Sequence, residues 1–184
     1  MSTRMIVNRV PISTGPAFVL EDVQEFARAE AGDFSGEMQR IATAAAREVE
    51  HFAQIALLRQ TIRVMIFDPV LDSSLRLPIG PVALDHMPTI TFDGEAFTDF
   101  QFDGGTRPYI RWSGPYFDRV PSRILIEYEA GFGDTASDIP ADLAQAVADQ
   151  AALMFDGRSP MDGRSMTSSP HMARIGARYR GVSL

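Results

Sequence analysis

The stretch SRILIEYEAGFGDTASDIPADLAQAVADQAALMF, from Ser122 to Phe155, decides the fold. Alternating apolar residues predict a strand over 123–129, and Gly131-Phe132-Gly133 predicts a tight turn with positive φ after it. A helix is then predicted to begin at Pro140, because proline is favoured in the first helical turn. Its apolar stripe recurs at helical spacing through Leu143, Val147, Ala151 and Met154. A strand, a turn and a helix therefore follow one another directly.

Two further helices are predicted closer to the N-terminus. Residues 20–30 have apolar residues at helical spacing, and Gly32 can end this helix. Residues 35–54 form a longer amphipathic pattern with one apolar face: Met38, Ile41, Ala45, Val49 and Phe52. We expect Val49 and Phe52 to pack against the last helix. Before residue 18, Pro11, Gly15 and Pro16 instead favour an irregular arm.

From Arg59 the apolar period changes from 3.6 residues to 2. Ile62, Val64 and Ile66 alternate with other residues and predict a strand, and Asp93-Gly94 is typical of a hairpin turn. Further short strands are predicted over the ranges 89–92, 99–102, 109–112 and 123–129. The closely spaced turn signals favour an antiparallel meander over residues 59–130.

These patterns predict one α+β domain over residues 1–156. Its architecture would be a small bundle of three helices (about 20–30, 35–54 and 140–155) with an antiparallel β insertion (about 59–130) between the second and last helix. Residues 157–184 contain Ser, Pro, Gly, Met and Arg with little periodicity. We expect them to form an extended, flexible basic tail.

The charge of the chain is unevenly distributed. All 17 basic residues are arginine, and the net charge is −7. Residues 157–184 hold five arginines and one acid, so they carry +4, and the remainder carries −11. The acidic body disfavours sequence-specific DNA binding, because it repels phosphate. With no cysteine there is no disulfide or thiolate metal site. Without a long apolar run or a signal pattern, we expect neither membrane insertion nor secretion.

The sequence predicts no catalytic, cofactor-binding or metal-binding residue. His51 falls on the polar face of the second predicted helix, and Asp85-His86 falls in a loop, so neither forms a metal or catalytic motif. No Gly-x-Ser-x-Gly motif is present, and Gly131-Phe132-Gly133 lacks the further residues of a phosphate-binding loop. Glu127 and Glu129 share one strand face, where we expect solvation. Trp112 is expected to be a packed strand aromatic.

The order of these motifs resembles the head–tail connector (adaptor) proteins of long-tailed phages and gene transfer agents. In that family a "V-x-Y-x-A-G-[FY]-G" strand precedes an "x-[IV]-P-x-x-[LI]-x-x-A" helix. The matching positions here are Ile126, Tyr128, Ala130, Gly131, Phe132, Gly133, Ile139, Pro140, Leu143 and Ala146. The family's "A-A-R-x-x-E" segment is matched by Ala45, Ala46, Arg47 and Glu50, and its "L-x-L-P-x-G-P-V" segment by residues 75–82.

This resemblance implies a structural protein of the virion or gene transfer particle, made in the bacterial cytoplasm, and no enzyme. As a head completion protein it would form a twelve-subunit ring beneath the portal protein and line the channel through which DNA passes. A stopper or tail-terminator protein would bind below. The alternative from the residues alone is a small enzyme or ligand-binding domain with its site in the β insertion. A deep pocket with strongly perturbed titratable groups would favour that alternative.

The basic tail is the candidate docking segment. Arg174, Arg178 and Arg180 occur with the apolar residues Ile175 and Tyr179 among them. In a short helix, Arg174 and Arg178 would share one side and bind a carboxylate-rich groove of the portal, with Ile175 and Tyr179 as apolar anchors. A solvated terminus without a docking role is the other interpretation. For the acidic body we expect a channel lined mainly by carboxylates, because DNA must pass without binding.

Overall fold

The computed structural model describes residues 4–29, 35–70, 72–157 and 168–180. The chain forms two compact units. We call the part made from the ranges 14–58 and 132–184 the helical unit, and the part made from 1–13 and 59–131 the β unit. The chain therefore passes between the units three times, and each unit is built from segments that are distant in sequence.

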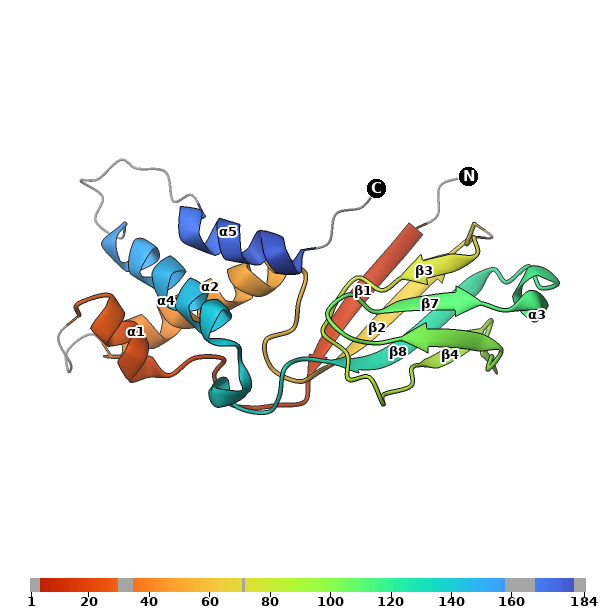
Figure 1. Cartoon of the computed structure of the whole chain (residues 1–184), viewed down its shortest axis with the longest axis horizontal. Helices are drawn as coiled ribbons and strands as arrows, with labels where there is room; N and C mark the ends of the chain where they lie inside the picture. The colour runs from red at the N-terminus through yellow and green to blue at the C-terminus, as the bar shows by residue number, and fades with distance from the viewer. Residues whose placement is uncertain (1–3, 30–34, 71, 158–167, 181–184) are drawn as a thin grey trace. The chain divides into compact units, whose positions relative to one another are not determined.

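The helical unit contains four helices of seven or more residues within its described part. They are α1 (Leu20–Phe26), α2 (Ser35–Ala53), α4 (Ala141–Asp156) and α5 (Pro170–Tyr179), with a 3₁₀ turn, η1 (Ala136–Asp138), before α4 (Figure 1). Helix α2 packs on α4, and α5 packs on both. Small residues on α2 (Ala42, Ala45 and Ala46) are buried, which lets the neighbouring helix approach closely.

The core of the helical unit confirms the predicted apolar faces of α2 and α4. Met38 and Val49 of α2 and Leu143 and Val147 of α4 are completely buried in one cluster. Phe52 is only partly buried and packs against the edge of that cluster. His51 is exposed, as its place on the polar face predicted.

The β unit consists of two antiparallel sheets. The five-stranded sheet has the order β1 (Arg4–Pro11), β2 (Gln60–Phe67), β8 (Arg123–Ala130), β4 (Thr89–Phe92), β5 (Glu95–Ala96). The smaller sheet has the order β3 (Ser74–Arg76), β7 (Tyr109–Trp112), β6 (Phe100–Asp103), and the short helix α3 (Gly114–Phe117) follows β7. Aromatic contacts join the two sheets, because the ring centroids of Phe92 in β4 and Trp112 in β7 are 5.9 Å apart.

The turns at Asp93-Gly94 and at Gly131 lie where the sequence predicts them. Asp93 and Gly94, both with positive φ, join β4 to β5. The Asp93 carboxylate also accepts hydrogen bonds from the Ser122 hydroxyl and from the backbone N–H groups of Ser122 and Arg123. Gly131, with φ of 139°, ends β8, which confirms the predicted turn. Trp112 is buried among Phe92, Phe97 and Tyr116, as expected for a packed aromatic.

Three features differ from the expectation. The strands of residues 59–130 do not form one meander, because β8 lies between β2 and β4 and the strands β3, β7 and β6 form a second sheet. Residues 4–11 are not part of an irregular arm: β1 pairs with β2 from Arg4↔Phe67 to Pro11↔Gln60. It is an edge strand with no buried residue, so its sequence lacks the alternation that marks a half-buried strand. The described part of the expected tail holds α5, so the helical unit has one helix more than the predicted three. Residues 158–167 and 181–184 lie outside the described part.

Candidate docking surfaces

Helix α5 contains four of the five residues that the sequence suggests for docking, and the fifth, Arg180, caps its C-terminal end. Its first turn is anchored by Ser169, whose hydroxyl accepts hydrogen bonds from the N–H groups of His171 and Met172 and contacts Asp149. The Ser169 N–H donates to the Gln150 side chain at 2.8 Å. A serine before Pro170 is a standard start for a helix, and here the start is fastened to α4.

One side of α5 is buried against the helical unit. Met172 and Ile175 are 1% and 2% exposed. Gly176 faces Phe52 of α2 so closely that a Cβ there would lie 2.5 Å from the ring. Met172, Ile175, Gly176 and Tyr179 are spaced as a short helical stripe, and contacts with α2 and α4 bury this side of α5.

Tyr179 closes the end of that stripe. Its hydroxyl donates a hydrogen bond to the Asp142 carboxylate at 2.9 Å, and its ring packs edge-on against Phe132 at 6.1 Å. Burial, together with the hydrogen bond to the negatively charged Asp142, raises the pKa of Tyr179 to about 12. The tyrosine is therefore engaged within its own unit.

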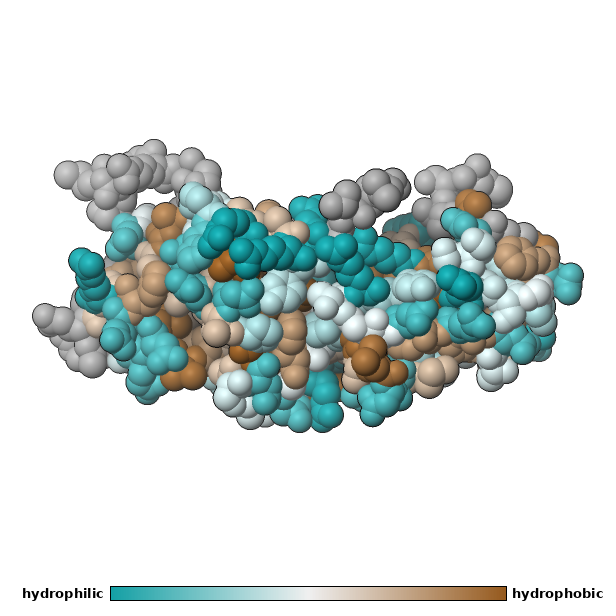
Figure 2. All heavy atoms as spheres, in the orientation of Figure 1, coloured by the Kyte–Doolittle hydropathy of each residue, from teal (hydrophilic) through white to brown (hydrophobic). Residues whose placement is uncertain are grey.

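The opposite side of α5 is basic and exposed. Arg174, Arg178 and Arg180 are all exposed, and Figure 2 shows strongly hydrophilic residues over α5 on the face in view. The Arg180 guanidinium lies 5.7 Å from the centre of the Phe52 ring, a cation–π distance. The structure thus separates the five selected residues: the three arginines face solvent, whereas Ile175 and Tyr179 contact the helical unit. A docking role for the arginines stays a prediction.

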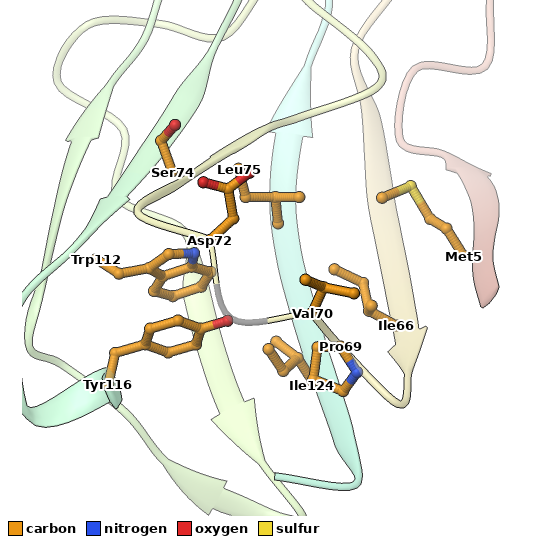
Figure 3. Close-up of a pocket in the computed structure, with 10 residues that line it drawn as sticks. All are labelled: Met5, Ile66, Pro69, Val70, Asp72, Ser74, Leu75, Trp112, Tyr116 and Ile124. Atoms are coloured by element: carbon orange, nitrogen blue, oxygen red, sulfur yellow. The ribbon is translucent and has the colours of Figure 1, made fainter. Parts of the chain in front are cut away.

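The β unit contains a hollow of about 180 Å³ between its two sheets. Figure 3 shows the stacked rings of Trp112 and Tyr116 on one side and Ile66 and Val70 on the other. The full lining is Met5, Ile66, Pro69, Val70, Asp72, Ser74, Leu75, Trp112, Tyr116 and Ile124. Burial and the nearby Asp72 charge raise the pKa of Tyr116. The lining suits an apolar group more than acid–base chemistry, since it offers one carboxylate and one phenol.

The remaining polar candidates are engaged with neighbours in the β unit. Glu127 accepts a hydrogen bond from Arg63 at 3.0 Å, and Glu129 lies 4.0 Å from Arg59, so both carboxylates have a cationic partner in addition to solvent. The His86 Nε2 atom accepts the Glu129 N–H at 3.1 Å. Within the described residues, no three His, Asp or Glu side chains gather closely enough to hold a metal ion.

No helix of the described ranges combines the length and the hydropathy that crossing a membrane requires.

The two units and their connections define an α+β protein with paired antiparallel sheets and a helical bundle. No protein-family model and no curated protein matches the sequence. Among solved structures, the chain is similar to a chain in the virion of a native gene transfer agent (GTA) particle, with 26% identity, 97% of each chain covered and a TM-score of 0.75.

Two similar chains come from particle necks. A chain in the neck of an empty GTA particle with C6 symmetry is 25% identical, with 97% coverage of both chains and a TM-score of 0.74. A chain in the neck of a native GTA particle with C12 symmetry has 23% identity, the same coverage and a TM-score of 0.70, which shows the shared fold. The chain thus matches, over 97% of its length, a component of a GTA particle neck.

Proposed function

We propose that this protein is a head–tail connector, or head completion protein, of a phage-like particle. It forms a ring beneath the portal, joins head to tail and surrounds the DNA channel. The proposal rests on the structural similarity to a chain from a GTA particle neck, because the match covers 97% of this chain and 97% of that one. The similarity therefore extends over nearly the full length of both chains.

The proposed number of subunits is twelve. The C6 symmetry of the neck that contains the similar chain at 25% identity supports an assembly with a multiple of six copies. In such a ring the portal binds above, and a stopper or tail-terminator protein binds below. The function is then structural, with no catalytic step. Nothing in the described residues favours the alternative of an enzyme in the β unit.

The charge distribution supports a channel that does not retain DNA. The body of the chain carries −11, whereas residues 157–184 carry +4. Arginines in a channel would bind phosphates and release counterions, so passage favours acidic walls. We therefore propose that carboxylates of the body line the channel and that the arginines of α5 face a protein.

The partner of α5 is proposed to be a carboxylate-rich surface of the portal. Arg174 and Arg178 are one helical turn apart and both exposed, so they share a side of α5. Arginine suits bidentate binding to carboxylates. Because the apolar side of α5 is already buried, this docking would be electrostatic, with the helix serving as a rigid support.

Deletion of the gene tests the main proposal. We expect heads that carry portal but lack tails, and a plasmid copy should restore tailed particles. A particle reconstruction should then place the chain between portal and tail. Normal tailed particles from the deletion strain, or density elsewhere in the particle, would refute the proposed function.

A pair of charge-reversal variants tests the docking of α5. Arg174→Glu with Arg178→Glu should leave the melting temperature unchanged, since both side chains are exposed, and should abolish portal binding. The matched control is Arg40→Glu with Arg47→Glu on the exposed side of α2. If the two double variants bind purified portal equally well, α5 has no docking role.

A further inference from the structure

The loop of residues 83–88, which we call the Leu84 loop, presents apolar side chains to solvent. Leu84 is 85% exposed and Met87 is 62% exposed. Large apolar side chains are costly to leave in water, and a pair of them on one short loop marks a contact surface. The sequence does not reveal this feature, because a loop position has no periodicity that predicts its exposure.

The Leu84 loop is held in a fixed conformation. The His86 N–H donates to the Ala83 carbonyl at 3.1 Å, and the His86 ring accepts the Glu129 N–H of β8. On its N-terminal side, Val82 and Gly105 exchange two backbone hydrogen bonds. Leu84 is therefore displayed on a rigid support, which lowers the entropy lost when it binds a partner.

The hollow of the β unit is a suitable receptor for such a side chain. Its volume of about 180 Å³ exceeds the ~150 Å³ of an engineered cavity that binds benzene, so it can receive one large aliphatic side chain. Its rim is also apolar and open, because Val70 is 69% exposed and Met5 is 41% exposed. The Leu84 side chain and the hollow are thus both apolar.

The Leu84 loop cannot fill the hollow of its own chain. The loop is attached to β8 near Glu129, whereas Ile124 of the same strand lines the hollow. Five residues of strand separate these positions by about 17 Å, which is farther than a leucine side chain reaches. A second copy of the chain can supply the loop, and a contact between opposite ends of identical units is the head-to-tail kind that generates rings.

We propose that the Leu84 loop of one subunit inserts Leu84 into the hollow of the next subunit, between Val70 and Trp112, with Met87 covering the rim. This contact rests on the proposed ring and identifies the surfaces that join its subunits. Every subunit contributes one Leu84 loop and one hollow, so a closed ring leaves none of these apolar groups in water. A monomer leaves both exposed.

Cysteine cross-linking in assembled particles tests this contact. The chain has no cysteine, so introduced thiols are unique, and a disulfide forms only where the Cα atoms lie within about 7 Å. The variant with Leu84→Cys and Val70→Cys, treated with a mild oxidant, should give a ladder of covalent multimers. Each single variant should give none, and Leu84→Cys with Leu153→Cys on α4 measures the background from collisions.

A second pair of variants measures the contribution of Leu84. Leu84→Asp should weaken self-association at least about tenfold, because burial of a leucine side chain contributes more than that factor requires. Leu153→Asp, at another exposed leucine, should leave it unchanged, and both should melt as the wild type does. Rings in particle necks without the Leu84–Val70 ladder would overturn this contact and leave the proposed function standing. Absence of the wild-type protein from necks would refute the proposed function, and the ring contact with it.

Discussion

At the scale of single residues, Tyr128 shows why the strand that precedes the Gly131 turn carries a tyrosine. Its side chain is buried, and its hydroxyl accepts the Ile79 N–H and donates to the Ile79 carbonyl. Burial raises the pKa of Tyr128 well above the usual 10.0. One side chain of β8 thus satisfies both backbone groups of a residue 49 positions away.

Replacing this hydroxyl should be costly. Tyr128→Phe leaves the Ile79 backbone groups without partners, and we expect a loss of about 1–3 kcal/mol in the free energy of unfolding. Urea denaturation measures it. Tyr109→Phe, at a less buried tyrosine, should change stability by less than about 0.5 kcal/mol, and similar losses for the two variants would contradict this role of Tyr128.

Asp93 gives a second prediction, on the pH dependence of stability. Hydrogen bonds from Ser122, and then from Arg123, lower the pKa of Asp93 below its ordinary 3.8. A carboxyl with a lowered folded-state pKa stabilises the fold above its unfolded pKa, and this stabilisation is lost as pH falls through the folded value. We therefore expect stability to fall below about pH 4, and Asp93→Asn to weaken that dependence. Unchanged acid sensitivity in Asp93→Asn would show that other carboxyls dominate.

At the scale of elements, α5 behaves as part of the helical unit. Met172 and Ile175 are in its core cluster, and Gly176 allows Phe52 to approach the helix backbone. A chain that ends at residue 157 would expose these contacts on α2 and α4. Deleting residues 158–184 would therefore disturb the core of the helical unit, which makes such a deletion a poor test of docking. Charge reversal on the exposed side of α5 is a better test.

The packing of α5 leads to a prediction with an internal control. Ile175→Ala should lower the free energy of unfolding by about 2–5 kcal/mol, as expected for a buried isoleucine. Arg174→Ala, on the preceding and exposed position, should change it by less than about 0.5 kcal/mol. Denaturant melts measure both. Equal effects would mean that α5 does not pack as described.

Gly176 and Phe52 should be energetically coupled. Gly176→Leu crowds the Phe52 ring, and overpacking of this kind costs about 1–3 kcal/mol. In the double variant with Phe52→Ala, the leucine occupies space that the ring has left, so the combined loss should be smaller than the sum of the two single losses. Additive losses in a double-mutant cycle would contradict this contact.

At the scale of the whole molecule, net charge governs the affinity of the protein for DNA. With a net charge of −7, the isolated protein should bind duplex DNA with a Kd weaker than about 10⁻⁴ M near physiological salt, the weak end of non-specific binding. A filter or gel-shift assay measures this, and the charge-reversal variant of α5 should behave alike. Tight, strongly salt-dependent binding would contradict an acidic channel.

The predicted helices, strands and turns depend on neighbours in the sequence. The stripe of α4, the alternation of β2 and β8 and the Asp93-Gly94 turn are set by backbone preferences and by the period of apolar residues. Their positions agree closely with the structure. The resemblance noted on these motifs also agrees with the likeness to chains of GTA particles.

Local sequence alone therefore determined the class of fold, the order of the central elements and the acidic balance of the body. Tertiary structure decided the conformation of residues 4–11, of α5 and of the Leu84 loop. Residues 4–11 became a strand because β2 offered an unpaired edge, and α5 became part of the core because α2 and α4 cover its apolar side. Leu84 is exposed on a loop whose position is set by hydrogen bonds that join Val82 and His86 to the distant residues Gly105 and Glu129. Each of these outcomes depends on free energy from contacts between residues far apart in the chain, which periodicity within a short window does not encode.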